Sequence, residues 1–523
     1  MDVAISWAVF SAFGVATAAL AVYGLHLYVL LFLFLRRVRG RRREQARTIS
    51  DFGHDRPMDR WPIVTTQIPI YNESHVAERI IEATTAIDYP HGRHEIQILD
   101  DSDDPTREVV DAVARRFVAE GVDIKVIRRP TRAGYKAGAL AHGLTSARGE
   151  YVAVFDADFV PPRNFLRMAI PLLEAEPKLA CLQGRWSHLN REESWLTEAQ
   201  ALGIDGHFAI EQGARAWNGL MMNFNGTAGV WRKAAIEDPR VGGWSGDTLT
   251  EDLDLSYRAQ LAGWKLDYCI DLACPAELPG TVAALKSQQR RWATGSIQAA
   301  RKLLPSIWRA KLSWSEKIEA TLHLTHYSVA LWMLLLAILA RPMLLVLTEG
   351  RVFGEWFWVG WSAILVSAVA PSMVYAYARY SLGGRWSGLR TIPAMLVLGC
   401  GMCVNNSLAV LRGLTLRGGE FVRTPKSGSA GRSSKVSRYR ATHSKMWIAE
   451  ILLATYSLFS FVVYFTAYHR VFSIFLLLYA LGFGLIGWLS RPVRHPAPFE
   501  GPLKTPSLIG SSVASVESAA GAR

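Results

Sequence analysis

Residues 151–158 read Tyr-Val-Ala-Val-Phe-Asp-Ala-Asp, an apolar run of strand-forming residues that ends in two acids. Three runs upstream have the same Val- and Ile-rich character, at residues 63–68, 96–99 and 124–127. Helical patterns separate the runs, at residues 78–86, 107–120 and 136–146. Strands that alternate with helices in this way predict an α/β fold with an open, mostly parallel sheet.

Acidic residues follow two of these predicted strands directly. Asp100 and Asp101 come after residues 96–99, and Asp156 and Asp158 come after the run that ends at Phe155. In open parallel sheets, ligands bind beyond the carboxyl ends of the strands. The first pair is therefore expected to contact a nucleotide, although a solvated acidic turn explains the same residues. The second pair can share Mg²⁺ or Mn²⁺, with a diphosphate completing the oxygen ligands.

A third acidic motif, Thr250-Glu251-Asp252, opens a helical pattern that runs to Gly263, a predicted C-cap glycine. Thr250 can cap this helix, which leaves both acids in the first turn. Acids in a first turn are often only favourable partners of the helix dipole. The functional alternative makes Asp252 a general base that takes a proton from an incoming hydroxyl group.

Gln288, Arg291 and Trp292 are spaced i, i+3 and i+4, so they share one face of a helix. An arginine fork suits a diphosphate, and a tryptophan offers a flat face for a sugar ring. Basic neighbours such as Arg290 and Arg301 fit a helix on a membrane surface. Taken alone, such a helix is more often a plain membrane anchor.

Apolar residues make up 50% of the 523-residue chain, and they gather at its two ends. The first apolar run, residues 3–35, is long enough to cross a bilayer, and six arginines follow it within residues 36–43. Positive charge marks the cytosolic side, so the following domain is expected in the cytosol. A signal peptide would instead carry its positive charge before the run.

Five more apolar segments follow the central domain, at about residues 321–348, 356–378, 391–411, 446–468 and 471–489. Basic residues crowd the stretches 379–390, 412–445 and 491–504. All three stretches are cytosolic only if residues 391–411 lie in the membrane interface or re-enter. Asn405 and Asn406 suit a helix that does not simply span lipid. We therefore predict five crossings.

The net charge of +13 raises the alternative of a nucleic-acid partner. The basic clusters lie at the ends of membrane segments, where headgroup contact explains them, and no nucleic-acid-binding module is visible. Five cysteines give no disulfide framework, and Cys400 and Cys403 favour core packing over a metal. His323 and His326 share a helix face, but two ligands favour polar lining over a metal site.

The acidic strand ends, the Thr-Glu-Asp motif and the Gln-x-x-Arg-Trp motif occur in an order that resembles the processive members of glycosyltransferase family 2. These include cellulose, chitin and hyaluronan synthases. The chain is most similar to the cellulose-synthase-like A and C proteins, which make mannan or glucomannan and the xyloglucan backbone. The matching runs are residues 182–186, 224–232, 277–279 and 288–292. The resemblance implies a GT-A-type fold in the cytosol and an α-helical transmembrane region.

The resemblance also implies a role for each matching residue. The residues expected to bind the nucleotide sugar are Asp100, Asp101, Lys136, Asp156, Gln288, Arg291, Thr424 and Lys426. Asp252 is the expected base, with Glu251 beside it in the catalytic motif, and Trp292 and Gln183 are expected to bind the acceptor. Asp156 and Asp158 would hold the metal. Thr424 and Lys426 fall in a run that resembles the gating loop of cellulose synthases, although Arg423 replaces the usual valine.

The implied activity is that of an inverting, processive β-glycosyltransferase. It would polymerise a mannan, glucomannan or glucan from GDP-mannose or UDP-glucose and extrude the product through the membrane. The expected partners are the nucleotide sugar, the growing polysaccharide and membrane lipid, without nucleic acid, and accessory subunits are left open. A non-processive enzyme that makes a glycolipid would leave the Gln-x-x-Arg-Trp helix unexplained. A silent export or scaffold subunit would have lost at least one of Asp156, Asp158, Asp252 and Arg291, and all four are present. A cyclic-dinucleotide receptor would need a larger carboxyl-terminal domain.

These expectations divide the chain into five parts. Residues 1–43 form a transmembrane helix with a basic flank, residues 44–282 the catalytic domain, and residues 283–320 amphipathic interface helices. Residues 321–490 form a second transmembrane region that includes the gating-like loop 412–445, and residues 491–523 a disordered tail. We expect a multi-pass protein of the plasma (inner) membrane, or of the Golgi in a eukaryote.

Overall fold

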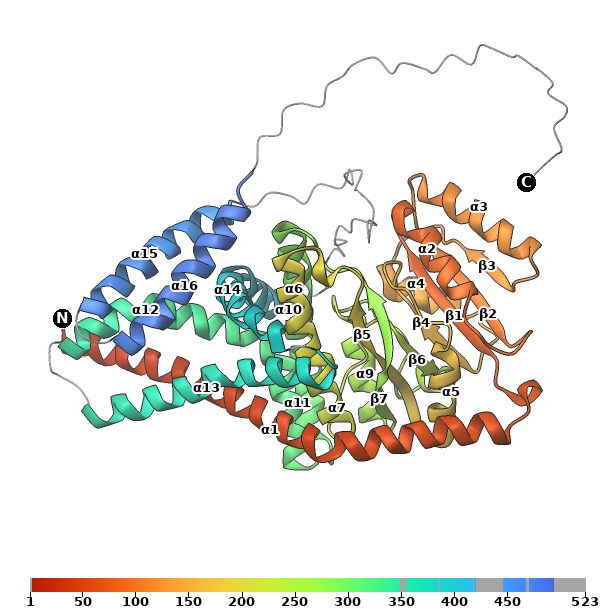
Figure 1. Ribbon diagram of the computed structural model, residues 1–523, viewed down its shortest axis with the longest axis horizontal. Helices are drawn as coiled ribbons and strands as arrows, with labels where there is room; N and C mark the ends of the chain where they lie inside the picture. The colour runs from red at the N-terminus through yellow and green to blue at the C-terminus, as the bar shows by residue number, and fades with distance from the viewer. Residues whose placement is uncertain are drawn as a thin grey trace, which may run out of the picture.

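The computed structural model of the chain describes residues 2–348, 354–384, 386–416, 418–419, 445–466 and 470–492. It has two parts that lie side by side along the long axis of the molecule (Figure 1). One part is a sheet with its covering helices, and the other is a group of long apolar helices. The predicted gating-like residues Thr424 and Lys426 and the predicted tail from residue 493 lie outside the described residues.

The central sheet has seven strands in the order β3-β2-β1-β4-β6-β5-β7. The strands are β1 (Val64–Ile70), β2 (His94–Asp100), β3 (Ile124–Ile127), β4 (Tyr151–Val154), β5 (Leu179–His188), β6 (Gly229–Arg232) and β7 (Lys265–Ala276). Strand β6 runs antiparallel to both of its neighbours, whereas the other pairs are parallel. The sheet is therefore mostly parallel, and the predicted α/β fold class is confirmed.

Helices cover both faces of the sheet. They are α2 (Ser74–Thr85), α3 (Thr106–Ala119), α4 (Tyr135–Leu144), α5 (Phe165–Ala175), α6 (Trp195–Gly206), α7 (Gln212–Ala216), α8 (Lys233–Ile236) and α9 (Glu251–Leu261). A π-helical turn, η3 (His207–Glu211), joins α6 to α7, and short 3₁₀ turns are η1 (Met58–Arg60) and η2 (Arg191–Glu193). The four strands and three helices predicted before residue 156 all form, with ends that differ from the expected ones by up to four residues.

The alternation of side chains along β4 shows why the sheet needs cover on two sides. Tyr151 and Ala153 pack into one core together with α2, α3 and α5, and Val152 and Val154 pack into a second core with α4 and α9. All four residues of the strand are buried. A strand buried on both faces reads as a continuous apolar run, because neither set of alternating side chains meets water.

The order of the strands creates a crevice at one edge of the sheet. From β1 the chain proceeds outward through β2 to β3, and then returns to place β4 on the other side of β1. Ligands of open α/β sheets bind where the order reverses, beyond the carboxyl ends of the strands. The carboxyl ends of β1, β2 and β4 therefore bring Asp100, Asp101, Asp156 and Asp158 to this edge.

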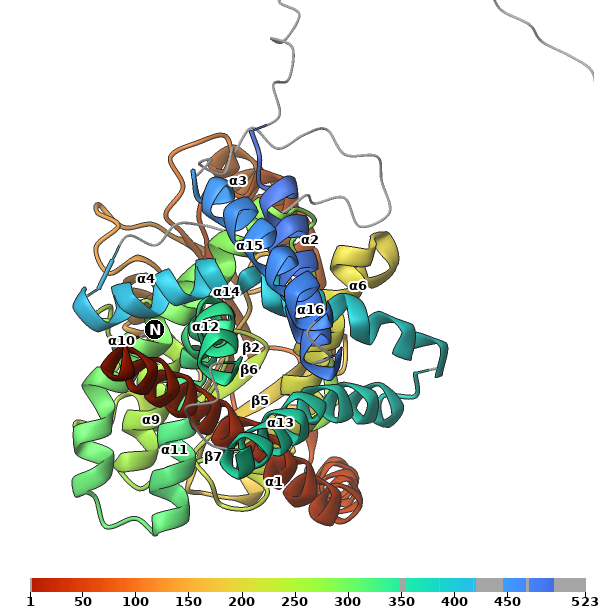
Figure 2. The same cartoon turned by 90° about the vertical axis from the view of Figure 1, so that its left-hand side faces the viewer.

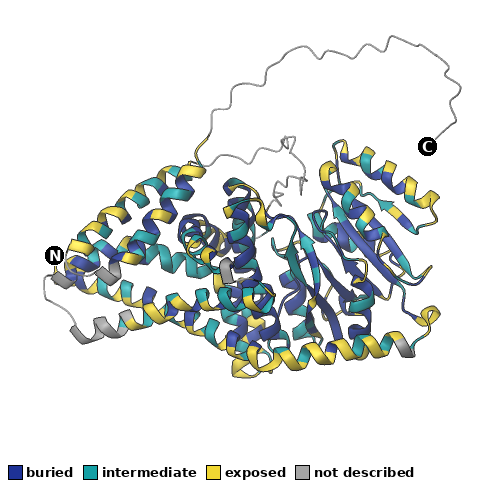
Figure 3. Cartoon of the chain, in the orientation of Figure 1, coloured by how far each residue is buried: buried dark blue, intermediate teal, exposed yellow. Residues whose placement is uncertain are grey.

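The apolar part consists of long helices. They are α1 (Val3–Asp55), α10 (Val282–Arg309), α11 (Trp314–Thr325), η4 (His326–Ser328), α12 (Val329–Thr348), α13 (Gly354–Ser381), η5 (Trp386–Thr391), α14 (Ile392–Thr415), α15 (Met446–Thr466) and α16 (Arg470–Leu489). Among the described residues, four helical stretches are long and apolar enough to cross a membrane: Val3–Gly53, Trp314–Val346, Gly388–Thr415 and Met446–Thr466. Much of their outer surface is exposed in the isolated chain (Figure 3).

Helix α14, which contains the predicted interface segment 391–411, lies across the other long helices. It is seen nearly end-on in Figure 1, where α12, α13, α15 and α16 are seen lengthwise. In Figure 2, α14 itself is seen lengthwise. It packs along α10, where Arg290 donates to Asn405 Oδ1 at 3.1 Å. Helix α14 thus runs in a different direction from its neighbours, although it is long and apolar enough to cross a membrane. That residues 391–411 do not cross, and that the chain crosses five times, stay predictions.

Helix α1 crosses the predicted domain boundary at residue 43 without a break. Its 53 residues run from the apolar helices to the lower side of the sheet part in Figure 1. Arg41 pairs with Asp267 at 2.7 Å and Arg42 with Asp271 at 2.6 Å, which fixes the helix to β7. Part of the predicted basic flank therefore holds the two parts of the chain together.

Candidate active site

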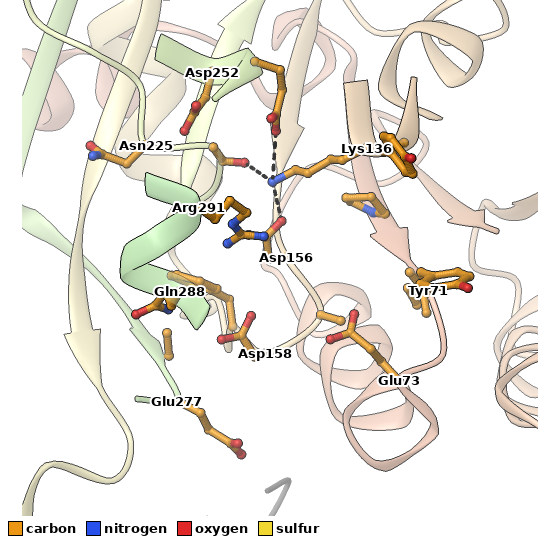
Figure 4. Close-up of a pocket in the computed structure, with 18 of the residues that line it drawn as sticks. Tyr71, Glu73, Lys136, Asp156, Asp158, Asn225, Asp252, Glu277, Gln288 and Arg291 are labelled. Atoms are coloured by element: carbon orange, nitrogen blue, oxygen red, sulfur yellow. Dashed lines mark hydrogen bonds and ion pairs between the residues drawn. The ribbon is translucent and has the colours of Figure 1, made fainter. Parts of the chain in front are cut away.

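A polar cavity of about 160 Å³ opens at the switch in strand order (Figure 4). Most of the predicted site residues line it, although they come from separate parts of the chain. They are Asp101, Lys136, Asp156, Asp158, Glu251, Asp252, Gln288, Arg291 and Trp292. The fold thus brings the acidic strand ends, the Thr-Glu-Asp motif and the Gln-x-x-Arg-Trp motif to one place.

Lys136 is the central cation of this cavity. Its Nζ donates to Asp156 Oδ1 at 2.5 Å and to the carbonyl oxygen of Gly226 at 2.8 Å, and it lies 3.9 Å from Glu251 Oε1. Burial lowers the pKa of Lys136, but the attraction of Asp156 and Glu251 outweighs it and the pKa is raised. The lysine therefore stays charged and links the carboxylate after β4 to the one that opens α9.

Asp252 combines a half-buried carboxylate with an acidic neighbour. Burial and the charge of Glu251 raise its pKa to about 7, against the opposing effect of Lys136. A carboxyl group with a pKa near neutrality is suited to general base catalysis, because it can take up and release a proton at the working pH. Thr250 stands at the N-cap position before it, but its hydroxyl makes no capping hydrogen bond, so that expectation was wrong.

The backbone next to Asp252 requires a glycine. Gly226 has φ +84°, a left-handed conformation, and a Cβ placed there would lie 2.9 Å from Asp252 Oδ2. A side chain at this position would be both strained and too close to the carboxylate. Gly226 therefore permits its carbonyl oxygen to meet Lys136 while Asp252 lies on its other side.

The structure separates the two acids after β2. Asp101 lines the cavity and pairs with Arg129 at 2.5 Å. Asp100 is 1% exposed, pairs with Arg128 at 2.8 Å and accepts a hydrogen bond from the backbone of Ser102. Asp100 thus holds the loop after β2 in place, while Asp101 faces the space where a ligand would lie.

Gln183, a predicted acceptor-binding residue, is fully buried behind the cavity and is not among its lining residues. Its Nε2 donates to the carbonyl oxygens of Thr227 and Ala228 at 3.1 Å each, and its Oε1 accepts from the backbone of Asn225 at 2.8 Å. The side chain therefore fixes the loop that carries Asn225 and Gly226, and it acts on the site through that loop.

A glycine brings α10 against the start of α9. A Cβ on Gly295 would lie 2.5 Å from Thr250 Cγ2 and 3.0 Å from the Thr250 backbone nitrogen. One turn further on, Gln298 Oε1 accepts from the backbone of Leu249 at 3.0 Å. This close approach places Gln288, Arg291 and Trp292 in the same cavity as Asp252.

A second cavity, of about 410 Å³, continues from the first toward the apolar helices. Asp252, Asn225, Gln288, Trp186 and Trp292 line both cavities. The far end of the second cavity is formed by residues of α13 and α14, and a third, mainly apolar cavity of about 380 Å³ adjoins it among α1, α12, α13, α14 and α16. Asp252 thus lies where a polar cavity meets a path toward the apolar helices.

Asp156 and Asp158 offer two hard oxygen ligands on one wall of the first cavity, which fits a divalent ion. Within the described residues, no group of three or more His, Cys, Asp or Glu side chains could hold a metal. Mg²⁺ is typically held by one or two carboxylates together with substrate phosphates and water. Asp156 and Asp158 would therefore bind the ion jointly with a diphosphate.

Several residues that line these cavities were not predicted from the sequence. Trp186 stacks on Phe208 at 4.9 Å between ring centroids and lies 6.3 Å from Trp292. His207 and Glu211 lie on the π-helical turn and line the second cavity. The i, i+4 spacing of a histidine and a glutamate was the available signal, but nothing in the local pattern connects it to Asp252.

The region that forms the sheet and the site matches a known family. Residues 62–295 match the sequence model described as "Glycosyltransferase like family 2". Residues 62–295 therefore match a family 2 glycosyltransferase domain, as the order of their motifs predicted.

Similar proteins with curated descriptions include plant enzymes. "Glucomannan 4-beta-mannosyltransferase 2" of Arabidopsis thaliana is 43% identical over 255 residues, 48% of this chain and 47% of the relative. "Glucomannan 4-beta-mannosyltransferase 1" of Oryza sativa subsp. japonica is 40% identical over 279 residues, 53% of each chain. This chain spans about half the length of the curated relatives it matches.

Solved structures give more distant likenesses. "Mannosyltransferase PcManGT from Pyrobaculum calidifontis in complex with GDP-Man and Mn2+" is 20% identical with a TM-score of 0.45, covering 69% of this chain and 98% of that one. S. aureus TarS in complex with UDP-GlcNAc is 14% identical with a TM-score of 0.37, covering 62% of this chain and 93% of that one.

Proposed function

We propose that this chain is an inverting, processive β-mannosyltransferase that polymerises mannan or glucomannan from a nucleotide sugar. The observation that carries the proposal is the position of Asp252. It lies between a cavity lined by Lys136, Arg291 and acidic residues and a second cavity that reaches the apolar helices. The family 2 domain and the names of the plant relatives support transfer of mannosyl units, and GDP-mannose is the donor we propose.

The chemistry follows from the residues that line the first cavity. Ionised Asp252 takes the proton from the acceptor hydroxyl as the hydroxyl oxygen attacks the anomeric carbon of the donor. The bond from that carbon to the diphosphate oxygen breaks, and its electron pair leaves with the nucleoside diphosphate. Because attack comes from the opposite face, an α-linked donor yields a β-linked product. Lys136 and Arg291 would offset the negative charge of the leaving group.

A divalent ion held by Asp156 and Asp158 would supply additional positive charge next to the diphosphate. Asp101 would bind the nucleoside part of the donor, because it faces the same cavity from the end of β2. Trp292 would support the acceptor sugar, since it lines both cavities beside Asp252.

We further propose that the catalytic domain is cytosolic and that five helices cross the membrane, with α14 in the interface. The arginines after the first apolar run and the basic stretches that follow the later ones support this orientation. The growing chain would leave Asp252 through the second and third cavities, which adjoin one another among the long helices. Processive synthesis and export would then use one path.

The test is product formation by the purified protein in proteoliposomes with Mg²⁺ or Mn²⁺. Labelled GDP-mannose and UDP-glucose are supplied separately, with Asp252→Asn in parallel. The proposal expects high-molecular-weight label from GDP-mannose that β-mannanase digests and that the variant does not make. Polymer formed only from UDP-glucose would identify UDP-glucose as the donor in place of GDP-mannose. Short lipid-linked product alone would contradict processive synthesis.

A further inference from the structure

The second cavity has a polar wall that the proposed reaction does not yet use. The π-helical turn η3 (His207–Glu211) forms this wall, and both end residues of the turn line the cavity. π-helical turns inside helices are rare and occur frequently at functional sites. The wall faces the same space as Asp252 and Trp292.

Glu211 lines the second cavity with a carboxylate that is only partly paired. Its Oε2 accepts from Arg215 at 3.0 Å and lies 3.5 Å from His207 Nδ1, whereas its Oε1 has no such contact with the described part of the chain. The side chain is 23% exposed. Burial opposes its ionisation, but Arg215 and His207 outweigh that effect and hold the pKa of Glu211 well below its ordinary value.

A chain of amide groups fixes the orientation of His207. Gln212 donates through Nε2 to Asn225 Oδ1, which leaves Asn225 Nδ2 to donate to His207 Nε2 at 3.2 Å. His207 Nε2 is then an acceptor, so the ring proton lies on Nδ1, toward Glu211. The polar wall is thereby tied to Asn225, whose neighbour Gly226 contacts both Lys136 and Asp252.

Aromatic side chains complete the surroundings of Glu211. Phe208, on the same π-helical turn, is buried and stacked on Trp186, which lies near Trp292. Sugars present apolar ring faces and a rim of hydroxyl groups, so a binding site for them combines flat aromatic surfaces with hydrogen-bonding groups. An ionised carboxylate accepts hydroxyl hydrogen bonds about twice as strong as those of a neutral acceptor.

We propose that Glu211 is an acceptor-binding residue that accepts hydrogen bonds from hydroxyl groups of the growing chain, one or more sugar units behind the hydroxyl that reacts. His207 is a positioning residue that holds the carboxylate in place. The ligand is a β-linked pyranose chain that carries neighbouring free hydroxyl groups. This inference rests on the proposed function. It adds that Glu211 holds the product between successive additions of a sugar.

The experiment measures how long the product grows. For a processive enzyme, chain length reflects the competition between the addition of a sugar and the release of the chain. Glu211→Gln keeps the shape of the side chain and removes its charge, so release should become faster. The wild type and the variant are compared in proteoliposomes with saturating GDP-mannose, or with the donor that the wild type uses. We expect products about tenfold shorter, as the loss of one charge-assisted hydrogen bond predicts, at a donor KM that is unchanged within about twofold.

The chain supplies a matched control. Arg215 pairs with two carboxylates, Glu211 and Glu319, and Glu319 does not line the second cavity. Glu319→Gln therefore removes a partner of Arg215 without removing a cavity carboxylate, and its product length should equal that of the wild type. Should Glu211→Gln not fold, as size-exclusion chromatography would reveal, His207→Gln takes its place and should also shorten the product.

Three results would overturn the proposal. Products of wild-type length from Glu211→Gln would show that Glu211 does not hold the chain. Equal shortening by Glu319→Gln would assign the effect to Arg215 and the packing around it. A wild-type protein that makes no polymer from any donor would remove the proposed function itself, and with it the acceptor that Glu211 would bind.

Discussion

Lys136 Nζ lies 2.5 Å from Asp156 Oδ1, so the lysine would compete with a divalent ion for this carboxylate. The same lysine lies 3.9 Å from Glu251. A single cation therefore balances the carboxylates after β4 and at the start of α9. Its removal should affect the binding of a metal ion and the binding of the donor in opposite directions.

Lys136→Met should raise the affinity of the free protein for Mn²⁺, because the lysine no longer competes for Asp156. Binding of the nucleotide sugar should weaken by about tenfold or more, since a charged contact to the diphosphate is lost. Mn²⁺ titration followed by electron paramagnetic resonance measures the first effect, and donor competition with a labelled nucleotide the second. Weaker Mn²⁺ binding in the variant would contradict this account.

Asp252→Asn should lower the rate of transfer by about 100-fold or more at an unchanged donor affinity, the range expected for a lost general base. In the wild type the ionised form is the active one, so activity should rise with pH through about 7 and then level off. A profile that stays flat between pH 5 and 9 would exclude Asp252 as the titrating base. Donor binding by the variant serves as the control for folding.

The same raised pKa has a consequence for stability. A carboxyl group whose pKa in the folded protein exceeds its unfolded value stabilises the fold below the unfolded pKa and loses that contribution as the pH rises through the folded pKa. The ionised Asp252 is thus unfavourable above about pH 7. Asp252→Asn should raise the Tm of the donor-free protein at pH 8 relative to the wild type, and by less at pH 5. Equal shifts at both pH values would contradict the linkage.

Some of this site is readable from the sequence and some of it is not. The acids after β4 could be placed because a fully buried strand gives an unbroken apolar run, and a parallel sheet puts its ligands at the ends of such strands. The choice between Asp100 and Asp101 could not be made, because it depends on how the two arginines that follow β3 pair with them: Arg128 pairs with Asp100, and Arg129 with Asp101. Strand β6 escaped prediction because its four residues, Gly229–Arg232, form neither a Val- and Ile-rich run nor a clear alternation.

Gln183 shows a different limit of sequence reasoning. A glutamine that matches a family motif reads as a ligand-binding residue, but its side chain is buried and bonded to the backbone of residues 225–228. The three-dimensional path of the loop decides this, and no local pattern encodes it. Glu211 is the opposite case, since it joins the cavity through a π-helical turn that the helical period does not reveal.

Gly295→Ala tests how closely α10 must approach Asp252. The new Cβ would lie 2.5 Å from Thr250 Cγ2 and 3.0 Å from the Thr250 backbone nitrogen, which is too close, so α10 or the start of α9 must move. A small misplacement of Arg291 and Trp292 should lower kcat by about tenfold, because catalysis depends on their alignment with the donor. Gly280→Ala, just before α10, meets nothing within 4 Å and should leave kcat unchanged. Equal kcat values for the two variants would contradict the proposed role of this contact.

A buried ion pair on another face of α10 should matter for stability. Lys286 Nζ lies 2.6 Å from Glu450 Oε1 of α15 and donates to Ser490 at 3.0 Å. Lys286→Met leaves an uncompensated carboxylate and should cost about 3–5 kcal/mol, whereas the double variant with Glu450→Leu should recover much of that loss. Thermal unfolding in detergent measures both, and a double variant less stable than Lys286→Met would be the contrary result.

Helix α1 connects the apolar helices to the sheet without interruption. An unbroken helix of 53 residues extends about 80 Å and contains no proline to bend it. Its first half lies among the apolar helices, and its arginines pair the second half with β7, so one continuous helix connects the two parts of the molecule. Under the proposed topology, a change in bilayer thickness that tilts the first half of α1 would also move β7, the edge strand of the sheet. Lipid composition would then affect the catalytic domain, and the rate of polymer synthesis should differ between thin and thick bilayers.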